Sequence, residues 1–231
     1  MPALTTHLLE LTQLGSDIIG VFDLPQKHCP QPGQYIPCQR VGDTDQLPKP
    51  LFRVFGGHGQ PSLGPTPASW NPGDRLLYTP PQGHGFTLPN SARRVGLVPF
   101  DVSPTRVLSL VVPALDQGAE IAVYCDSGLP IEVLSRIPSR VEVLSLSALS
   151  EDPTWPEYVA VDLERMSLAA LLDRFELFKL SADVDVLVRT PMPCLGIGAC
   201  GVCAVDARRG YRFACSDGPV FPLKGLRHVA G

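Results

Sequence analysis

The segment "MPCLGIGACGVC", residues 192–203, concentrates three cysteines and three glycines in twelve positions. A fourth cysteine follows in "RFACSDGPVF", residues 212–221, so the spacing is C-x5-C-x2-C-x11-C. A 2Fe–2S cluster of the plant ferredoxin type is held by a C-x4-C-x2-C loop and one distant cysteine, and this chain departs from that pattern by one residue. The spacing therefore predicts a cluster ligated by Cys194, Cys200, Cys203 and Cys215.

The glycines between these cysteines favour an iron–sulfur cluster over other uses of the thiols. Gly196, Gly198 and Gly201 permit the positive φ angles that let backbone N–H groups face a negatively charged cluster. Two alternatives stay open. A structural zinc site usually pairs two Cys-x2-Cys knuckles, and only one is present here. A set of buried free cysteines beside a glycine turn is the other alternative.

The composition of the whole chain excludes several classes of protein. The chain has 231 residues, 44% of them hydrophobic, and a net charge of −4, so we expect no general attraction to nucleic acid. The N-terminal residues lack a signal-peptide pattern, and no apolar run reaches membrane-spanning length, which predicts a cytoplasmic protein without a membrane span. Three scattered cysteines, Cys29, Cys38 and Cys125, are interpreted as structural.

The pattern along the chain predicts a β-barrel followed by an α/β layer. Residues 1–91 contain short alternating segments bounded by glycine and proline, which indicates a small antiparallel barrel. The glycines at 83 and 85 indicate a hairpin turn, with a phosphate-binding loop as the alternative. In residues 92–190 buried strands alternate with helices, expected at 103–118 and 167–180, as in a parallel sheet. Residues 191–231 form a third, small module around the cysteines.

The cysteine segment resembles the C-terminal module of the electron-transfer subunit of two-subunit, NAD-dependent dihydroorotate dehydrogenases. That family has a Met-x-Cys-Gly-x-Gly-x-Cys-x-x-Cys loop and a fourth cysteine followed by Asp-Gly-Pro-Val-Phe. Cys200, Cys203 and Cys215 match directly, as do residues 217–221. Cys194 lies one position early because Leu195 is additional.

Weaker matches extend the resemblance toward the N-terminus. "PGQY" (32–35) is similar to the family's Pro-Gly-Gln-Phe, "LFRVFGGHGQ" (51–60) to a Leu-Tyr-Arg strand that contacts FAD, and "PPQGHGF" (80–86) to Gly-Pro-Leu-Gly-Asn-Gly-Phe. The resemblance implies a ferredoxin-reductase-like fold with a flavin-reductase-like barrel at 1–91, a reduced nucleotide-domain-like layer at 92–190 and a cluster module at 191–231. The FAD-binding positions that it implies are Leu51, Phe52, Arg53, Gly59 and Gln60.

Two departures from the family concern its nucleotide cofactors. The family's Arg-Pro-x-Ser motif, which holds the flavin, is absent from residues 36–50, where "KPLF" (49–52) is the nearest imitation. The family's Gly-Gly-Gly-x-Gly turn is replaced by "PFDVSP" (99–104), in which Asp101 would repel a pyrophosphate. The Cys-Gly-Pro segment is also absent before Met192. We therefore expect FAD to be weakly bound or absent, and NAD not to bind.

The resemblance implies an electron-transfer subunit without catalytic residues of its own. Its partner would be an FMN-containing dihydroorotate dehydrogenase catalytic subunit, in a heterotetramer that serves pyrimidine biosynthesis. Subunits of the same architecture serve hydrogenases, sulfite reductases and transhydrogenases, which are alternatives. A zinc-stapled, non-redox assembly protein is the alternative from another class.

Overall fold

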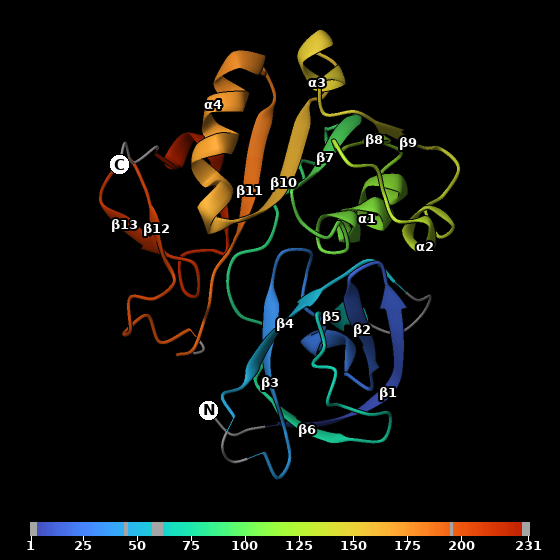
Figure 1. The fold of residues 1–231 in the computed structure, drawn as a ribbon, viewed down its shortest axis with the longest axis vertical. Helices are drawn as coiled ribbons and strands as arrows, with labels where there is room; N and C mark the ends of the chain where they lie inside the picture. The colour runs from blue at the N-terminus through green and yellow to red at the C-terminus, as the bar shows by residue number, and fades with distance from the viewer. Residues whose placement is uncertain (1–3, 44–45, 57–61, 195, 228–231) are drawn as a thin grey trace.

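The computed structural model describes residues 4–43, 46–56, 62–194 and 196–227 (Figure 1). Its N-terminal strands form a closed antiparallel barrel in the order β1-β2-β5-β4-β3-β6. Gly15, with a φ of 61°, makes the tight turn between β1 and β2. The barrel strands are β1 (Leu4–Leu14), β2 (Asp17–Phe22), β3 (Tyr35–Arg40), β4 (Lys49–Arg53), β5 (Ser62–Gly64) and β6 (Arg75–Tyr78).

A six-stranded sheet follows the barrel, in the order β14-β11-β10-β7-β8-β9. Five of its strands are parallel, and β14 pairs antiparallel with β11. The expected β-barrel plus α/β fold is thus confirmed. The strands are β7 (Arg94–Phe100), β8 (Glu120–Tyr124), β9 (Val141–Leu144), β10 (Tyr158–Glu164), β11 (Asp183–Arg189) and β14 (Val220–Pro222).

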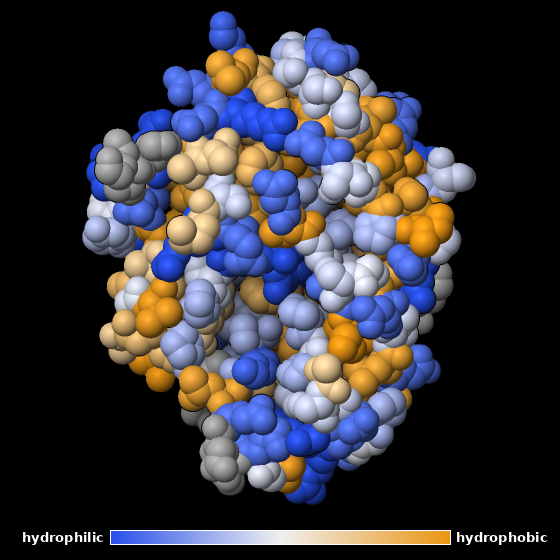
Figure 2. Space-filling view, in the orientation of Figure 1, coloured by the Kyte–Doolittle hydropathy of each residue, from blue (hydrophilic) through white to orange (hydrophobic). Residues whose placement is uncertain are grey.

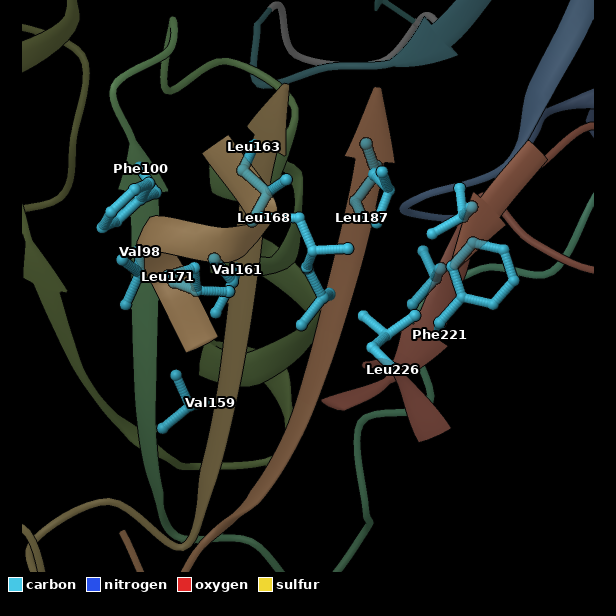
Figure 3. Packing of buried hydrophobic residues seen from close by; sticks show 14 of the residues in the cluster. Val98, Phe100, Val159, Val161, Leu163, Leu168, Leu171, Leu187, Phe221 and Leu226 are labelled. Atoms are coloured by element: carbon cyan, nitrogen blue, oxygen red, sulfur yellow. The ribbon is translucent and has the colours of Figure 1, made fainter. Parts of the chain in front are cut away.

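The central strand β10 packs both of its faces, which explains its nearly continuous apolar sequence. Val159, Val161 and Leu163 face helix α4 (Leu168–Phe178) and the C-terminal segment, as Figure 3 shows. Tyr158 and Ala160 face the other side of the sheet, where 3₁₀ helix η2 (Val107–Leu110) and α1 (Val111–Asp116) pack. The sheet therefore forms the centre of two hydrophobic cores.

Helix α4 forms where the sequence predicted a helix within 167–180. Its buried residues Leu168, Leu171, Phe175 and Phe178 recur at spacings of three and four, which places them on one helical face. Burying each such side chain contributes about 1.5–3 kcal/mol. The helix ends at Lys179, whose φ of 51° is left-handed.

The helix expected at 103–118 is shorter than predicted, which corrects that expectation. Ser103 does not cap it, because the Ser103 hydroxyl donates a hydrogen bond to the Asp17 carboxylate at 2.7 Å. Helical structure begins with η2 and continues into α1, and the expected stop is found at Gly118, whose φ is 77°. The short helices α2 (Ile131–Leu134) and α3 (Ala148–Glu151) were not predicted.

The C-terminal segment is joined to both preceding layers. Strands β12 (Ala204–Asp206) and β13 (Tyr211–Phe213) form a separate hairpin, while β14 extends the main sheet. Figure 2 shows hydrophobic side chains gathered over α2 and β9 and, on the opposite edge, over the cysteine loop, where Ile197 is 78% exposed. Among the described residues, no helix is long and apolar enough to cross a membrane.

Candidate iron–sulfur centre

The four cysteines of the sequence motif lie in the segment between the end of β11 and the start of β14. They differ in how exposed their side chains are to solvent. Cys203 and Cys215 are both only 1% exposed and belong to the hydrophobic core under α4. Cys194 is half-buried, and Cys200 is exposed. Strands β12 and β13 join Cys203 to Cys215, so the hairpin fixes the separation of these two residues.

The thiols approach one another as two pairs. The Sγ atoms of Cys203 and Cys215 are 3.2 Å apart. The Cys200 thiol lies within hydrogen-bonding distance of the Cys194 sulfur. Within the described residues, no three metal-ligating side chains are arranged around a single ion. Two pairs are what a 2Fe–2S cluster requires, since its irons share two sulfides and each takes two thiolates.

The backbone of the loop faces the same thiols. Gly196, Gly198 and Gly201 have φ angles of 92°, 71° and 72°, as the sequence predicted. The Gly198 N–H donates to the sulfurs of both Cys194 and Cys215. At Gly196, an added Cβ would lie 2.5 Å from the Gln82 side-chain oxygen, so a larger residue does not fit there.

These contacts act differently on the thiols of Cys194 and Cys215. Partial burial raises the pKa of Cys194, but the hydrogen bond from Cys200 and those from backbone N–H groups outweigh it and lower the pKa to about 6. Burial, together with the neighbouring Cys203, raises the pKa of Cys215 to about 12. Because iron binds the thiolate, Cys194 is ready to ligate, whereas Cys215 must lose its proton as the cluster assembles.

Two side chains from outside the module hold the inner pair, and the sequence did not single out either. The Tyr35 hydroxyl, on β3, donates to the Cys215 carbonyl oxygen at 2.9 Å and is fully buried. Arg165 donates to the carbonyl oxygens of Val202 and Ala204, at 2.8 and 3.1 Å, on either side of Cys203. The one available signal was that "PGQY" has a tyrosine where the resembling family has phenylalanine.

Removing the Tyr35 hydroxyl is expected to change the cluster while leaving the fold intact. In Tyr35→Phe the ring remains, and the loss of one hydrogen bond costs about 0.5–1.5 kcal/mol of stability. Since a donor dipole near the inner pair is lost, the midpoint potential of the cluster should shift to a more negative value, measured by a redox titration. An unchanged potential would show that Tyr35 has only a packing role.

The segment at residues 83–85 joins the barrel to the cysteine module, and this corrects the expectation of a hairpin turn. The His84 N–H donates to the Gly218 carbonyl oxygen at 2.5 Å, and His84 forms a parallel bridge with Pro219. An added Cβ on Gly83 would lie 2.6 Å from the same Gly218 oxygen. The glycine permits this close approach, which brings the barrel against the chain just after Cys215.

The loop after β7 contains one left-handed residue, which is an aspartate rather than a glycine. Asp101 has a φ of 53°, a left-handed conformation that aspartate tolerates better than most residues. A hollow of about 810 Å³ lies beside it at the carboxyl ends of β7 and β8, and it carries the carboxylates of Asp101, Asp126 and Glu132. Three carboxylates there would repel a pyrophosphate.

Titration of the purified chain with NADH is therefore expected to show no saturable binding at micromolar concentration. The physical reason is charge repulsion in place of the helix-terminus and backbone N–H contacts that pyrophosphates require. Fluorescence of NADH, followed during the titration, measures this directly. Saturation, or rapid reduction of the cluster by NADH alone, would contradict it.

The predicted FAD-binding residues lie on β4, and their side chains are already engaged. Leu51 and Phe52 are buried, Arg53 is half-buried, and Gly59 and Gln60 lie outside the described residues. The Phe52 ring lies 4.5 Å from the guanidinium carbon of Arg106, and its centre lies 5.6 Å from that of the Tyr35 ring. Burial lowers the pKa of Arg106 to about 10, and its Nε and Nη1 atoms have no hydrogen-bond partner.

The position of β4 in the chain also bears on the flavin. It follows β3, which begins directly after Gly33 and Gln34, and it precedes β5, so "KPLF" comes after the Gly-Gln segment as the family's Arg-Pro-x-Ser does. Strand β4 (KPLFR) contains no serine, so it offers no hydroxyl hydrogen bond to a flavin. The residues of β4 do not fit the flavin in the manner that the family motif implies.

Flavin released by heating the freshly purified protein is expected to be far below one FAD per chain. Losing two or three hydrogen bonds costs on the order of 2–6 kcal/mol, or about 30-fold to 10⁴-fold in affinity. Chromatography of the released flavin after gel filtration measures the amount. One FAD per chain would mean that other residues of this barrel hold it.

Comparison with known proteins agrees with the fold and the centre. Residues 190–227 match the family of the iron–sulfur cluster binding domain of dihydroorotate dehydrogenase B. The electron transfer subunit of dihydroorotate dehydrogenase B (NAD(+)) from Desulforamulus reducens is 27% identical over 192 residues, which cover 74% of this chain and 71% of the relative.

Two solved structures share the fold at low sequence identity. An NADH-dependent reduced ferredoxin–NADP oxidoreductase, studied for flavin-based electron bifurcation, has a TM-score of 0.70 at 16% identity. The match covers 96% of this chain and 89% of the oxidoreductase chain. Phthalate dioxygenase reductase, a modular structure for electron transfer from pyridine nucleotides to a 2Fe–2S centre, has a TM-score of 0.57 at 12% identity. The match covers 97% of this chain and 77% of the reductase chain.

The fold is ferredoxin-reductase-like, and residues 190–227 match an iron–sulfur cluster binding domain. The chain is similar to the electron transfer subunit of dihydroorotate dehydrogenase B, as its C-terminal sequence indicated.

Proposed function

We propose that this chain is an electron-transfer subunit whose 2Fe–2S cluster is ligated by Cys194, Cys200, Cys203 and Cys215. It passes electrons between an FMN-containing dihydroorotate dehydrogenase catalytic subunit, in pyrimidine biosynthesis, and a further acceptor. The observation that carries the proposal is the arrangement of four free thiols in two pairs, inside the segment that matches the iron–sulfur domain.

The inner and outer cysteines would have different roles in such a subunit. The bound cluster accepts and releases one electron at a time, which lets it connect a flavin to another one-electron carrier. Cys203 and Cys215 fix the inner end of the centre within the core, away from water. Cys200 and the 78% exposed Ile197 leave the outer edge within reach of a partner.

The proposal includes the setting of the subunit. It places the chain in the cytoplasm, in a heterotetramer with the catalytic subunit, and without catalytic residues of its own. It also keeps the division into a barrel at residues 1–91, an α/β layer at 92–190 and a cluster module at 191–231. These boundaries accord with strand β6 ending at Tyr78 and β7 beginning at Arg94.

Two measurements test the proposal. Protein purified without oxygen should be brown and contain two irons and two sulfides per chain; a colourless protein with stoichiometric zinc would favour an assembly role instead. Purification of the tagged chain from its own host should then recover an FMN-containing partner. In that complex dihydroorotate should bleach the cluster absorption, whereas the chain alone should not respond. Recovery of a different redox enzyme would redirect the proposal to that complex.

A further inference from the structure

The hairpin β12–β13, which joins two of the cluster cysteines, concentrates positive charge. Its turn and second strand carry Arg208, Arg209 and Arg212, all three exposed. The chain as a whole has a net charge of −4, so the positive charge of this hairpin is a local feature that the overall composition does not explain. Figure 1 shows the hairpin at the edge of the molecule, and Ala207 in its turn forms an isolated bridge with Leu226.

None of these three guanidinium groups is engaged within the described part of the chain. The arginines that form ion pairs are Arg40, Arg94, Arg174 and Arg189. The side chains of Arg208, Arg209 and Arg212 enter no ion pair and no hydrogen bond between described residues. Three free guanidinium groups close together repel one another, and an anionic group between them would remove that repulsion.

The three arginines surround a hollow of about 410 Å³. Its floor is apolar and includes Phe221 and Leu226, which are 5% and 4% exposed. One carboxylate, that of Asp217, also lines the hollow, but it accepts the Phe213 N–H at 2.8 Å. The hollow thus presents a fixed apolar base and a rim of positive charge, a combination typical of a docking surface.

We propose that this arginine hollow, defined by Arg208, Arg209, Arg212, Phe221 and Leu226, docks an acidic face of the protein that exchanges electrons with the cluster. The proposal rests on the proposed function and adds the chemistry of the partner's contact surface. Carboxylate side chains of the partner pair with the guanidinium groups, and an apolar side chain of the partner covers the floor.

The position of the hollow favours a redox partner over a small anion. A strand rises about 3.3 Å per residue, so Arg208, which follows Cys203 by five residues, lies within about 17 Å of it along the hairpin. A protein held there brings its own redox group close to the cluster, whereas a small anion gains nothing from that position. Electron-transfer complexes also have small interfaces and are steered by complementary charge.

The test uses the full chain with its cluster and two protein probes. Flavodoxin hydroquinone, a strongly acidic donor, gives one electron to the oxidised cluster and becomes its semiquinone. Stopped-flow absorption measures the rate at several salt concentrations. We expect the rate to fall as salt rises, and to fall about tenfold or more in Arg209→Glu/Arg212→Glu at low salt, because steering by charge is lost.

The control variant, Arg136→Glu/Arg140→Glu, makes the same change in net charge between α2 and β9, on the other side of the molecule in Figure 1. Equal slowing in both variants, or no slowing in the hairpin variant, would overturn the proposal. Inhibition by millimolar phosphate or ADP at constant ionic strength would overturn it in favour of a small-anion site. The second probe, basic cytochrome c, accepts one electron from the reduced cluster and does not depend on an arginine-rich docking surface. Its reduction therefore tests the proposed function by itself. If cytochrome c is not reduced, the proposed function fails, whatever the result with flavodoxin.

Discussion

Replacing Cys203 by serine is expected to abolish the iron–sulfur centre. Cys203 is 1% exposed, and its sulfur lies 3.2 Å from that of Cys215, so no other described thiol can take its place without moving the core. A serine hydroxyl stays protonated at neutral pH and is a far weaker ligand for iron than a thiolate. Iron and sulfide content, together with the visible absorption spectrum, measure the loss.

The loss should also lower stability, because the centre links parts of the core. Cys203, Cys215 and Val205 belong to the hydrophobic cluster under α4, and a bound metal group contributes folding free energy. Cys125→Ala provides a matched control, since Cys125 is a buried thiol at the end of β8, outside the cysteine module. Full iron and sulfide with an unaltered spectrum in Cys203→Ser would sink the ligand assignment.

The four cysteines of the proposed centre stand out in the sequence because most of them are close together along the chain. Three of the four proposed ligands fall within ten residues, and the glycines that shape the loop lie between them. The pairing of the thiols, with Cys203 beside Cys215, could not be predicted from spacing alone. It depends on the β12–β13 hairpin, whose two short strands bring the two residues together.

The supports of the centre come from distant parts of the chain, which explains why the sequence did not reveal them. Tyr35 is 180 residues away from Cys215, and Arg165 is 37 residues from Val202. Neither carries a local motif. The barrel and the α/β layer were predictable from alternating and buried apolar runs, whereas the antiparallel addition of β14 to the sheet depends on packing against β11.

A buried ion pair holds the strand ends where the missing nucleotide turn would be. The Asp162 side chain on β10 is fully buried, and the Arg189 Nε and Nη2 atoms on β11 lie 2.7 and 2.5 Å from its two oxygens. Arg189 also donates to the Ser103 carbonyl oxygen at 2.8 Å, which fixes the loop after β7. Burial alone lowers the pKa of Arg189, and Asp162 more than reverses that effect.

Changing Asp162 to asparagine is therefore expected to destabilise the protein strongly. The substitution keeps the shape of the side chain but leaves the Arg189 charge buried without its counter-ion, at a cost of about 3–5 kcal/mol. For a chain of this size each kcal/mol lowers the melting temperature by about 2–4 °C, so the loss should be roughly 6–20 °C. Thermal unfolding followed by circular dichroism measures it.

Two further variants separate the buried charge from other causes. Asp126→Asn removes an ion pair with Arg174 whose side chains are 46% and 42% exposed, and it should cost no more than about 1 kcal/mol. Asp162→Asn/Arg189→Met removes both charges, and it should recover part of the stability lost in the single variant because no unpaired charge remains. If the double variant melts below Asp162→Asn, Arg189 stabilises the loop after β7 by its contact with Ser103 rather than by its pairing with Asp162.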